Sequence, residues 1–126
     1  MITEEERNTL LDAVKRASET WKLAFNGKCA DGCVAQYETD AVMHAQPFGT
    51  FKGHNEIRKF WQKLIDHGFT DIKYSNTEIE VIDKHTAALS AEWSMNKASG
   101  VIHKELWILQ NDGSAKLKED DFEAVE

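Results

Sequence analysis

The chain has 126 residues, of which 41% are apolar, enough for the core of one domain and too few for a second. Its 22 acidic and 15 basic side chains give a net charge of −7, which argues against a nucleic-acid partner because phosphate binding needs a basic surface. The sequence has no apolar run near the ~18 residues that span a membrane and no secretory signal, so we expect a cytoplasmic protein with one domain over residues 1–126.

The first half of the chain has the pattern of three amphipathic helices. Thr3 and Glu6 form a capping box, and apolar residues then recur every three or four positions as far as Asn26-Gly27, which stops the helix. Residues 31–37 predict a short second helix. Residues 55–67 predict a third helix with one apolar face.

The second half has the alternating pattern of strands. Strands are predicted over residues 41–46, 48–52, 72–82, 86–96, 101–110 and 116–125, most of them separated by short turns. Helices followed by hairpin-linked strands indicate an α+β fold, with the helices packed on one face of an antiparallel sheet.

The sequence predicts neither a metal nor a cofactor. The five histidines lack the spacing of a metal site, and no glycine-rich loop is present to hold a phosphate. Cys29 and Cys33 lie four residues apart on a predicted helix, which is poor geometry for a disulfide. We expect them to be two small thiols without a chemical role.

The order of signals between Asn26 and Leu64 is specific to one fold family. A helix ends at Asn-Gly, and a short helix, a strand, a turn at Pro47 and a third helix follow. This order resembles the nuclear transport factor 2-like superfamily, particularly its SnoaL-like and ketosteroid isomerase-like branch. The resemblance implies a strongly curved sheet that forms a cone with the first helix and holds a ligand inside. It implies no single reaction, because the superfamily contains isomerases, dehydratases, hydrolases, cyclases and binding modules.

The resemblance also allows a comparison with ketosteroid isomerases. Their proton-shuttling carboxylate immediately precedes the proline of this turn, and their oxyanion-hole tyrosine comes from the first helix. The matching positions here are Gln46 and Trp21, and an amide cannot serve as a general base. The third family position, a protonated acid on a late strand, falls near Glu105. We therefore expect that the protein is not a ketosteroid isomerase.

Two pairs of polar residues are the candidates for acid–base chemistry. His44 and Gln46 alternate on one predicted strand, and His103 and Glu105 alternate on another, so each pair shares a sheet face. If both pairs face the cone, Glu105 could orient His44 as a general base, which makes these two the candidate catalytic residues. The alternative is that His103 and Glu105 lie on the outer face, because a shift of one residue in register reverses the assignment.

The tryptophans are the candidates for an aromatic pocket. The first helix and the central strand border the cone in the resembled family, and these elements carry Trp21 and Trp93. The predicted ligand-binding residues are Trp21, Gln46, Trp93, His103 and Trp107. We expect a small apolar or polycyclic ligand, with isomerase, hydratase or cyclase chemistry that needs no cofactor. The alternative is a non-catalytic binding or interaction module whose cone is filled by its own side chains.

Two further expectations concern the C-terminal strands. Asp120 and Asp121 place one carboxylate at the rim of the pocket or form a solvated strand end. The last long strands carry apolar residues on both faces, which predicts a homodimer through the outer face of the sheet, as is common in the resembled family.

Overall fold

The computed structural model describes residues 2–125 and has the α+β fold predicted from the sequence. Its elements in chain order are α1 (Glu4–Asn26), α2 (Ala30–Val34), β1 (Tyr37–Gln46), β2 (Gly49–Lys52), α3 (Gly53–Asp66), β3 (Lys73–Asp83), β4 (Thr86–Ser94), β5 (Ser99–Leu109) and β6 (Ala115–Ala124). No helix within this described range combines the length and the apolar character that crossing a bilayer requires.

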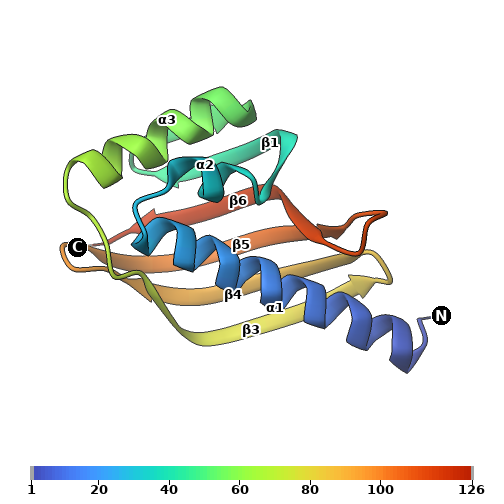
Figure 1. Ribbon diagram of the computed structural model, residues 1–126. Helices are drawn as coiled ribbons and strands as arrows, with labels where there is room; N and C mark the ends of the chain where they lie inside the picture. The colour runs from blue at the N-terminus through green and yellow to red at the C-terminus, as the bar shows by residue number, and fades with distance from the viewer. Residues whose placement is uncertain (1, 126) are drawn as a thin grey trace.

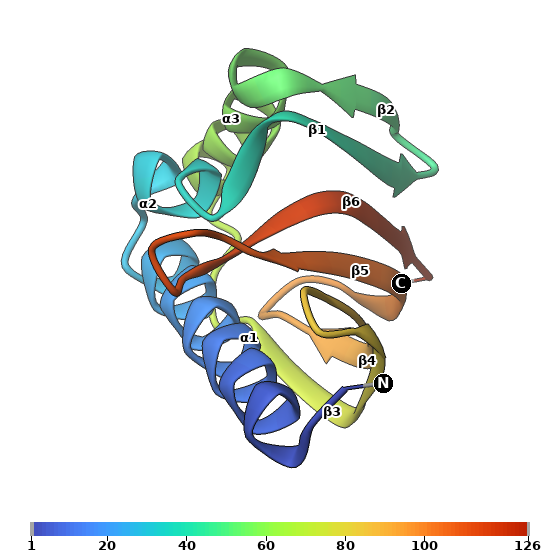
Figure 2. The ribbon, with the colours of Figure 1, turned by 90° about the vertical axis from the view of Figure 1, so that its right-hand side faces the viewer.

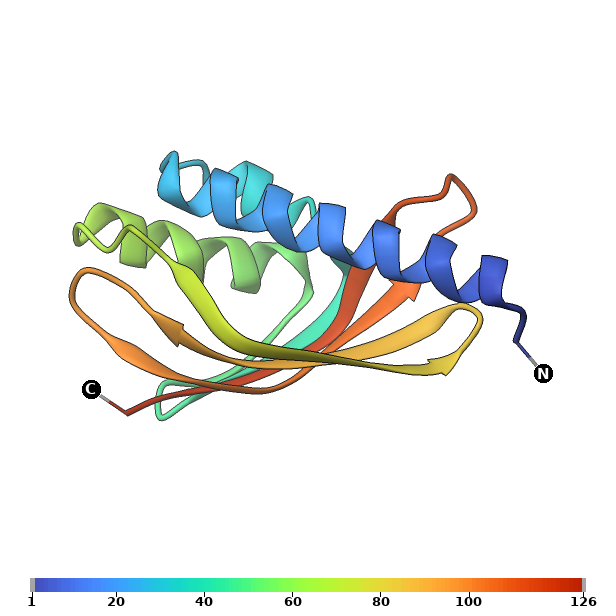
Figure 3. The ribbon, with the colours of Figure 1, turned by 90° about the horizontal axis from the view of Figure 1, so that it is seen from below.

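The molecule has two layers, with the helices on one face of a single curved sheet (Figures 1 and 3). The strand order is β2-β1-β6-β5-β4-β3. Neighbouring strands are antiparallel except β1 and β6, which run parallel and join the first strand of the chain to the last. Figure 2 shows how the sheet bends around the helices, and this curvature creates an inner, concave face.

Hydrogen bonds of nearby residues determine where the first two helices begin and end. The predicted capping box is present in α1: the Thr3 hydroxyl accepts from the Glu6 amide at 3.0 Å, and the Glu6 carboxylate accepts from the Thr3 amide at 3.0 Å. The end of α1 at Asn26 also agrees with the prediction. The second helix is shorter than predicted, because Tyr37 already pairs with Leu117 as the first residue of β1.

Two β-bulges interrupt the alternation of the central strands. Between β5 and β6, Ile102 pairs with Phe122 but Lys104 pairs with Asp121, so His103 is an extra residue in β5. Further along the same pair, β6 has an extra residue of its own, Lys118. On either side of each bulge, the residues that face inward change between odd and even positions.

Candidate functional site

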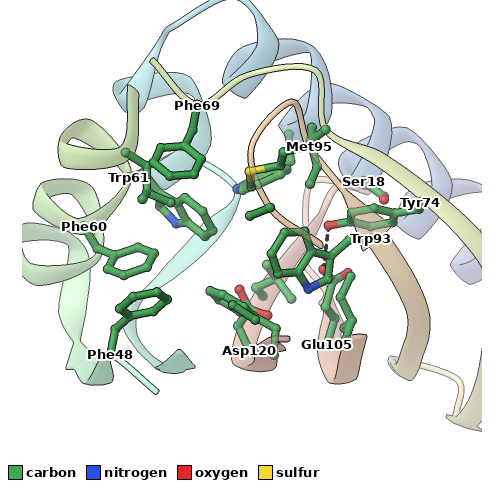
Figure 4. Close-up of a pocket in the computed structure, with 18 of the residues that line it drawn as sticks. Ser18, Phe48, Phe60, Trp61, Phe69, Tyr74, Trp93, Met95, Glu105 and Asp120 are labelled. Atoms are coloured by element: carbon green, nitrogen blue, oxygen red, sulfur yellow. Dashed lines mark hydrogen bonds between the residues drawn. The ribbon is translucent and has the colours of Figure 1, made fainter. Parts of the chain in front are cut away.

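An apolar cavity of about 160 Å³ lies between the concave face of the sheet and the helices. In Figure 4, Phe60, Trp61 and Phe69 line one side of this cavity, and Trp93 and Met95 line the other. An engineered apolar cavity of about 150 Å³ is large enough to bind benzene. The volume therefore suits a molecule of one or two rings and is small for a larger polycycle.

Two carboxyl groups form the polar part of this cavity. Glu105 on β5 and Asp120 on β6 are direct cross-strand partners, and each is only 4% exposed. Both side chains line the cavity and lie in the lower part of the view of Figure 4. Cross-strand partners have Cβ atoms only about 4.5–5.5 Å apart, so the two acids are close enough to interact.

Aromatic side chains hold both carboxyl groups by hydrogen bonds. The Tyr74 hydroxyl donates to Oε2 of Glu105, and the Trp107 indole donates to Oε1, each at 3.0 Å. The Tyr37 hydroxyl donates to Oδ2 of Asp120 at 2.6 Å. Both oxygens of Glu105 are therefore engaged, whereas Oδ1 of Asp120 is the oxygen left for a ligand.

Burial makes these two groups unusually weak acids. Loss of water raises the pKa of Glu105 to about 8, with the negative charge of Asp120 as a second cause. Loss of water also raises the pKa of Asp120 to about 7, although the bond from Tyr37 opposes the shift. Because two close carboxylates resist ionising together, the pair retains a proton near neutral pH.

The two tyrosines stay protonated beside this pair. Burial raises the pKa of Tyr37 and of Tyr74 well above the ordinary phenol value, and the nearby carboxyl groups raise both values further. Each phenol is therefore a fixed hydrogen-bond donor to a carboxyl group. Tyr37 is itself held in place by the Trp61 indole, which donates to its hydroxyl at 3.2 Å.

The prediction that His44 faces the cavity is wrong. Ala41, Met43 and Ala45 are buried on the concave side of β1, so His44 lies on the opposite, outer face. Its Nδ1 atom contacts the Thr50 hydroxyl at 3.1 Å, and Glu105 is not its partner. The apolar side chains at alternate positions of β1 face the core, and the polar side chains between them face outward.

Gln46 and His103 also lie outside the cavity. Gln46 is exposed and donates to Oδ1 of Asp121 at 3.3 Å, and it helps line a shallow polar depression on the outer face. His103 is the extra residue of the β5 bulge, and its Nε2 contacts the Glu123 carboxylate at 3.0 Å. The bulge separates His103 from Glu105, so the two do not share a face.

The structure places four of the predicted site residues in the cavity wall: Glu105, Trp21, Trp93 and Trp107. Two of them have an unused polar atom. The indole N–H groups of Trp21 and Trp93 are buried and have no hydrogen-bond acceptor within residues 2–125. Leaving a buried donor unpaired costs about 1–3 kcal/mol, so each of these groups needs an explanation.

The predicted site residues did not include Asp120, Tyr37 or Tyr74, nor the other polar lining residues Ser18 and Lys97. Asp120 was expected at the pocket rim or at a solvated strand end, and Tyr37 was placed at the end of a helix. One signal could have identified the acid: adjacent Asp120 and Asp121 on a strand point to opposite faces, so one of them must face the core. No comparable signal distinguishes Tyr74 from other strand aromatics.

The described residues, 2–125, contain no group of three or more His, Cys, Asp or Glu side chains arranged to hold a metal ion. The polar groups of the cavity wall are the carboxyl pair, two phenols, the indole donors, the Ser18 hydroxyl and the Lys97 ammonium group.

Comparison with known proteins identifies a family and a set of similar folds. Residues 18–113 match the family model described as a SnoaL-like domain. Among solved structures, a putative scytalone dehydratase from Novosphingobium aromaticivorans has a TM-score of 0.83 at 14% identity, over 98% of this chain and 89% of that chain. No curated protein matches the chain in sequence.

Two other solved structures have the same fold. A hexachlorocyclohexane dehydrochlorinase of the LinA type from Novosphingobium barchaimii has a TM-score of 0.77 at 12% identity, over 98% of this chain and 92% of that one. A ketosteroid isomerase-like protein from Erwinia carotovora atroseptica has a TM-score of 0.76 at 16% identity, with 99% of each chain covered. At identities this low, the likenesses show the fold and carry no reaction across.

Proposed function

Since this chain belongs to the SnoaL-like domain family, we propose that it binds a small apolar ring compound in the cavity and moves protons on it without a cofactor. Asp120 and Glu105 are the proposed acid–base pair. The similar solved structures include proteins described as a dehydratase and a dehydrochlorinase, and both names denote eliminations. The proposal keeps Glu105 from the sequence-based site and replaces His44 with Asp120.

The observation that carries this proposal is the carboxyl pair itself. A protein gains nothing in stability from burying two adjacent acids in an apolar cavity, because removing a carboxyl group from water is costly. Such an arrangement does supply an acid and a base at the same pH, since a pair that retains one proton has one carboxyl and one carboxylate. Groups with strongly shifted pKa values in a cavity are typical of functional sites.

We assign the two roles from the hydrogen bonds of the pair. Asp120 has a free oxygen, Oδ1, and serves as the base that takes a proton from a ligand carbon. Glu105 retains the proton of the pair. When a ligand displaces the Tyr74 hydroxyl from Oε2, Glu105 gives this proton either to a second carbon, which completes an isomerisation, or to a leaving hydroxyl, which departs as water. In either case the proton gained by Asp120 balances the proton lost by Glu105, and transfer within the pair or through water restores the starting state.

Proton exchange with a small ketone tests this function. We expect the protein to accelerate exchange of the α-protons of 2-tetralone for deuterium in D₂O, as followed by NMR. Asp120→Asn and Glu105→Gln should each reduce the enzymatic rate by about 10²-fold or more, because general acid–base catalysis contributes rate factors of this size. Asp121→Asn is the matched control, because this neighbouring carboxylate lies on the outer face with Gln46.

Binding without exchange would contradict the proposed chemistry. If 2-tetralone binds in the cavity but exchanges no faster than in buffer, the protein is not an acid–base catalyst of this kind. Circular dichroism of each variant should accompany the rates, so that loss of folding is not mistaken for loss of catalysis.

The second candidate function is a non-catalytic binding module, and one observation favours it. Three of the four oxygens of the carboxyl pair already accept hydrogen bonds from Tyr74, Trp107 and Tyr37. A pair held in this way would have a structural role alone, which is to fix the strands and to shape the cavity. In that case Glu105→Gln and Asp120→Asn would change the melting temperature or the ligand affinity, and no exchange would be observed with any variant.

A further inference from the structure

The four tryptophans of the chain all line the same cavity but differ in what their N–H groups meet. Trp61 donates to the Tyr37 hydroxyl, and Trp107 donates to the Glu105 carboxyl. Trp21 and Trp93 have no acceptor among residues 2–125. The cavity wall therefore has two indole donors that are already used and two that are not.

The unused donors cannot turn toward bulk water. Trp21 is 5% exposed, with its ring stacked on Phe25 at a centroid distance of 5.5 Å and an edge contact to Trp61 at 4.9 Å. Both neighbours hold the indole in one orientation. Any acceptor for its N–H group must come from inside the cavity or from a rearrangement of the wall.

Trp93 is held as firmly from the other side. It is 7% exposed, and its ring lies against its cross-strand partner Gly100, where an added Cβ would be only 2.7 Å from a ring carbon. Phe122 makes an edge contact with the same ring at a centroid distance of 6.3 Å. A side chain at position 100 would collide with the Glu123 backbone and with this ring, so glycine is needed there for the indole to keep its place, with its N–H group buried.

We propose that Trp21 and Trp93 donate hydrogen bonds to an acceptor oxygen on the ligand, so that the ligand is a small ring compound with a carbonyl or similar oxygen rather than a hydrocarbon. The inference rests on the proposed function, because it concerns the ligand of the same cavity. A hydrocarbon of the right shape would fill the space and leave both donors unpaired. An oxygenated ring satisfies a donor and keeps the apolar contacts, which gives the cavity a preference that apolar packing alone cannot supply.

A pair of nearly isosteric probes isolates the oxygen. Acetophenone and α-methylstyrene have the same ring and branching and differ by oxygen in place of a CH₂ group. With ¹⁵N-labelled protein, the four indole N–H signals can be followed separately by NMR during titration. We expect acetophenone to move the Trp21 and Trp93 signals downfield, in the direction of hydrogen bonding, and α-methylstyrene to leave them without such a shift.

Substitutions measure the same preference as an affinity ratio. Trp93→Phe and Trp21→Phe keep an aromatic ring and remove the donor, so each should reduce the preference for acetophenone over α-methylstyrene by about two- to tenfold, the range for one hydrogen bond. Trp61→Phe is the matched control. It removes an indole whose N–H donates to Tyr37 and should weaken both probes by the same factor.

The outcomes separate this inference from the proposed function. If both probes bind and neither unpaired indole signal responds differently to them, the assignment of the donors is overturned while the cavity remains a ligand site. If neither probe binds, the proposed ligand site fails as well. The NMR titration uses the unaltered protein, so the inference stays testable even if a tryptophan variant does not fold.

Discussion

Glu105 and Asp120 lose contact with bulk water on folding, and a carboxyl group in that situation keeps its proton more tightly. The consequence is a link between pH and stability. In the unfolded chain both groups ionise near their ordinary pKa values of about 4, whereas in the folded protein they do so near 7 and 8. The folded state therefore binds more protons than the unfolded state throughout the interval between these values.

This difference predicts that the free energy of unfolding falls as pH rises from about 4 to about 8. The steepest slope is about 1.4 kcal/mol per pH unit for each extra proton bound by the folded state. Glu105→Gln cannot ionise and should flatten this slope. The measurement is urea denaturation at several pH values, with Glu80→Gln on the exposed part of β3 as the control.

An unchanged slope in Glu105→Gln would show that this carboxyl group is ionised in the folded protein. That result would also remove the acid from the proposed mechanism.

At the scale of elements, the segment between α3 and β3 is held by two asparagines. This segment, residues 67–72, contributes Phe69 and Ile72 to the cavity wall. From the β4–β5 turn, the Asn96 side chain accepts from the Thr70 amide at 3.1 Å and donates to the Gly68 carbonyl at 2.9 Å. At the end of α1, Asn26 accepts from the Ile72 amide at 2.7 Å.

We predict that Asn96→Ala loosens this segment while the rest of the fold stays intact. The substitution removes two hydrogen bonds near the surface, where water partly replaces them, so the expected loss of stability is about 1 kcal/mol. Hydrogen exchange followed by mass spectrometry should show faster exchange in residues 67–72. Asn111→Ala in the β5–β6 turn is the control, and equal exchange in both variants would refute the role of Asn96.

The elements also show what could be predicted from the sequence. The periods of apolar residues located the helices and strands to within a few residues, because burial of one face imposes those periods. The inner faces of β1 and β5 were not predictable in the same way. His44 was predicted to face the cavity because it shares a strand face with Gln46, whereas the buried residue of this stretch is its neighbour Met43. In β5, the extra residue separates His103 from Glu105. A bulge shifts the alternation by one residue, and in β5 apolar residues on both faces hide that shift, so only the paired strands reveal it.

At the scale of the whole molecule, no helix of residues 2–125 covers the outer face of the sheet (Figure 3). Val101, Leu106 and Ile108 are half-buried on β5, between polar groups such as the ion pair of Lys104 with Glu119. Apolar side chains of this kind on an open sheet face are typical of a contact between subunits. We propose a homodimer through this face.

The dimer predicts a solution mass of about twice 14.3 kDa at micromolar concentration, measured by sedimentation or light scattering. Leu106→Glu should convert it to a folded monomer, because a charge at the centre of an apolar contact has no partner. Leu23→Glu is the control, since this exposed leucine lies on α1, away from the sheet face. A single species near 14 kDa for the unaltered chain would end the proposal.

The bulge at Lys118 also determines how β6 can change in length. Lys118 and Glu119 both face away from the cavity, and Leu117 and Asp120 on either side of them face inward. Loss of Lys118 would therefore restore simple alternation and leave Asp120 and Phe122 inside. Loss of Asp121, only three positions later, would turn Phe122 to the outside and dismantle the aromatic wall. Deletion of one residue from β6 is therefore expected to preserve the cavity wall at Lys118 and to destroy it at Asp121. Related chains that are one residue shorter at the bulge can still have the same inward-facing acid.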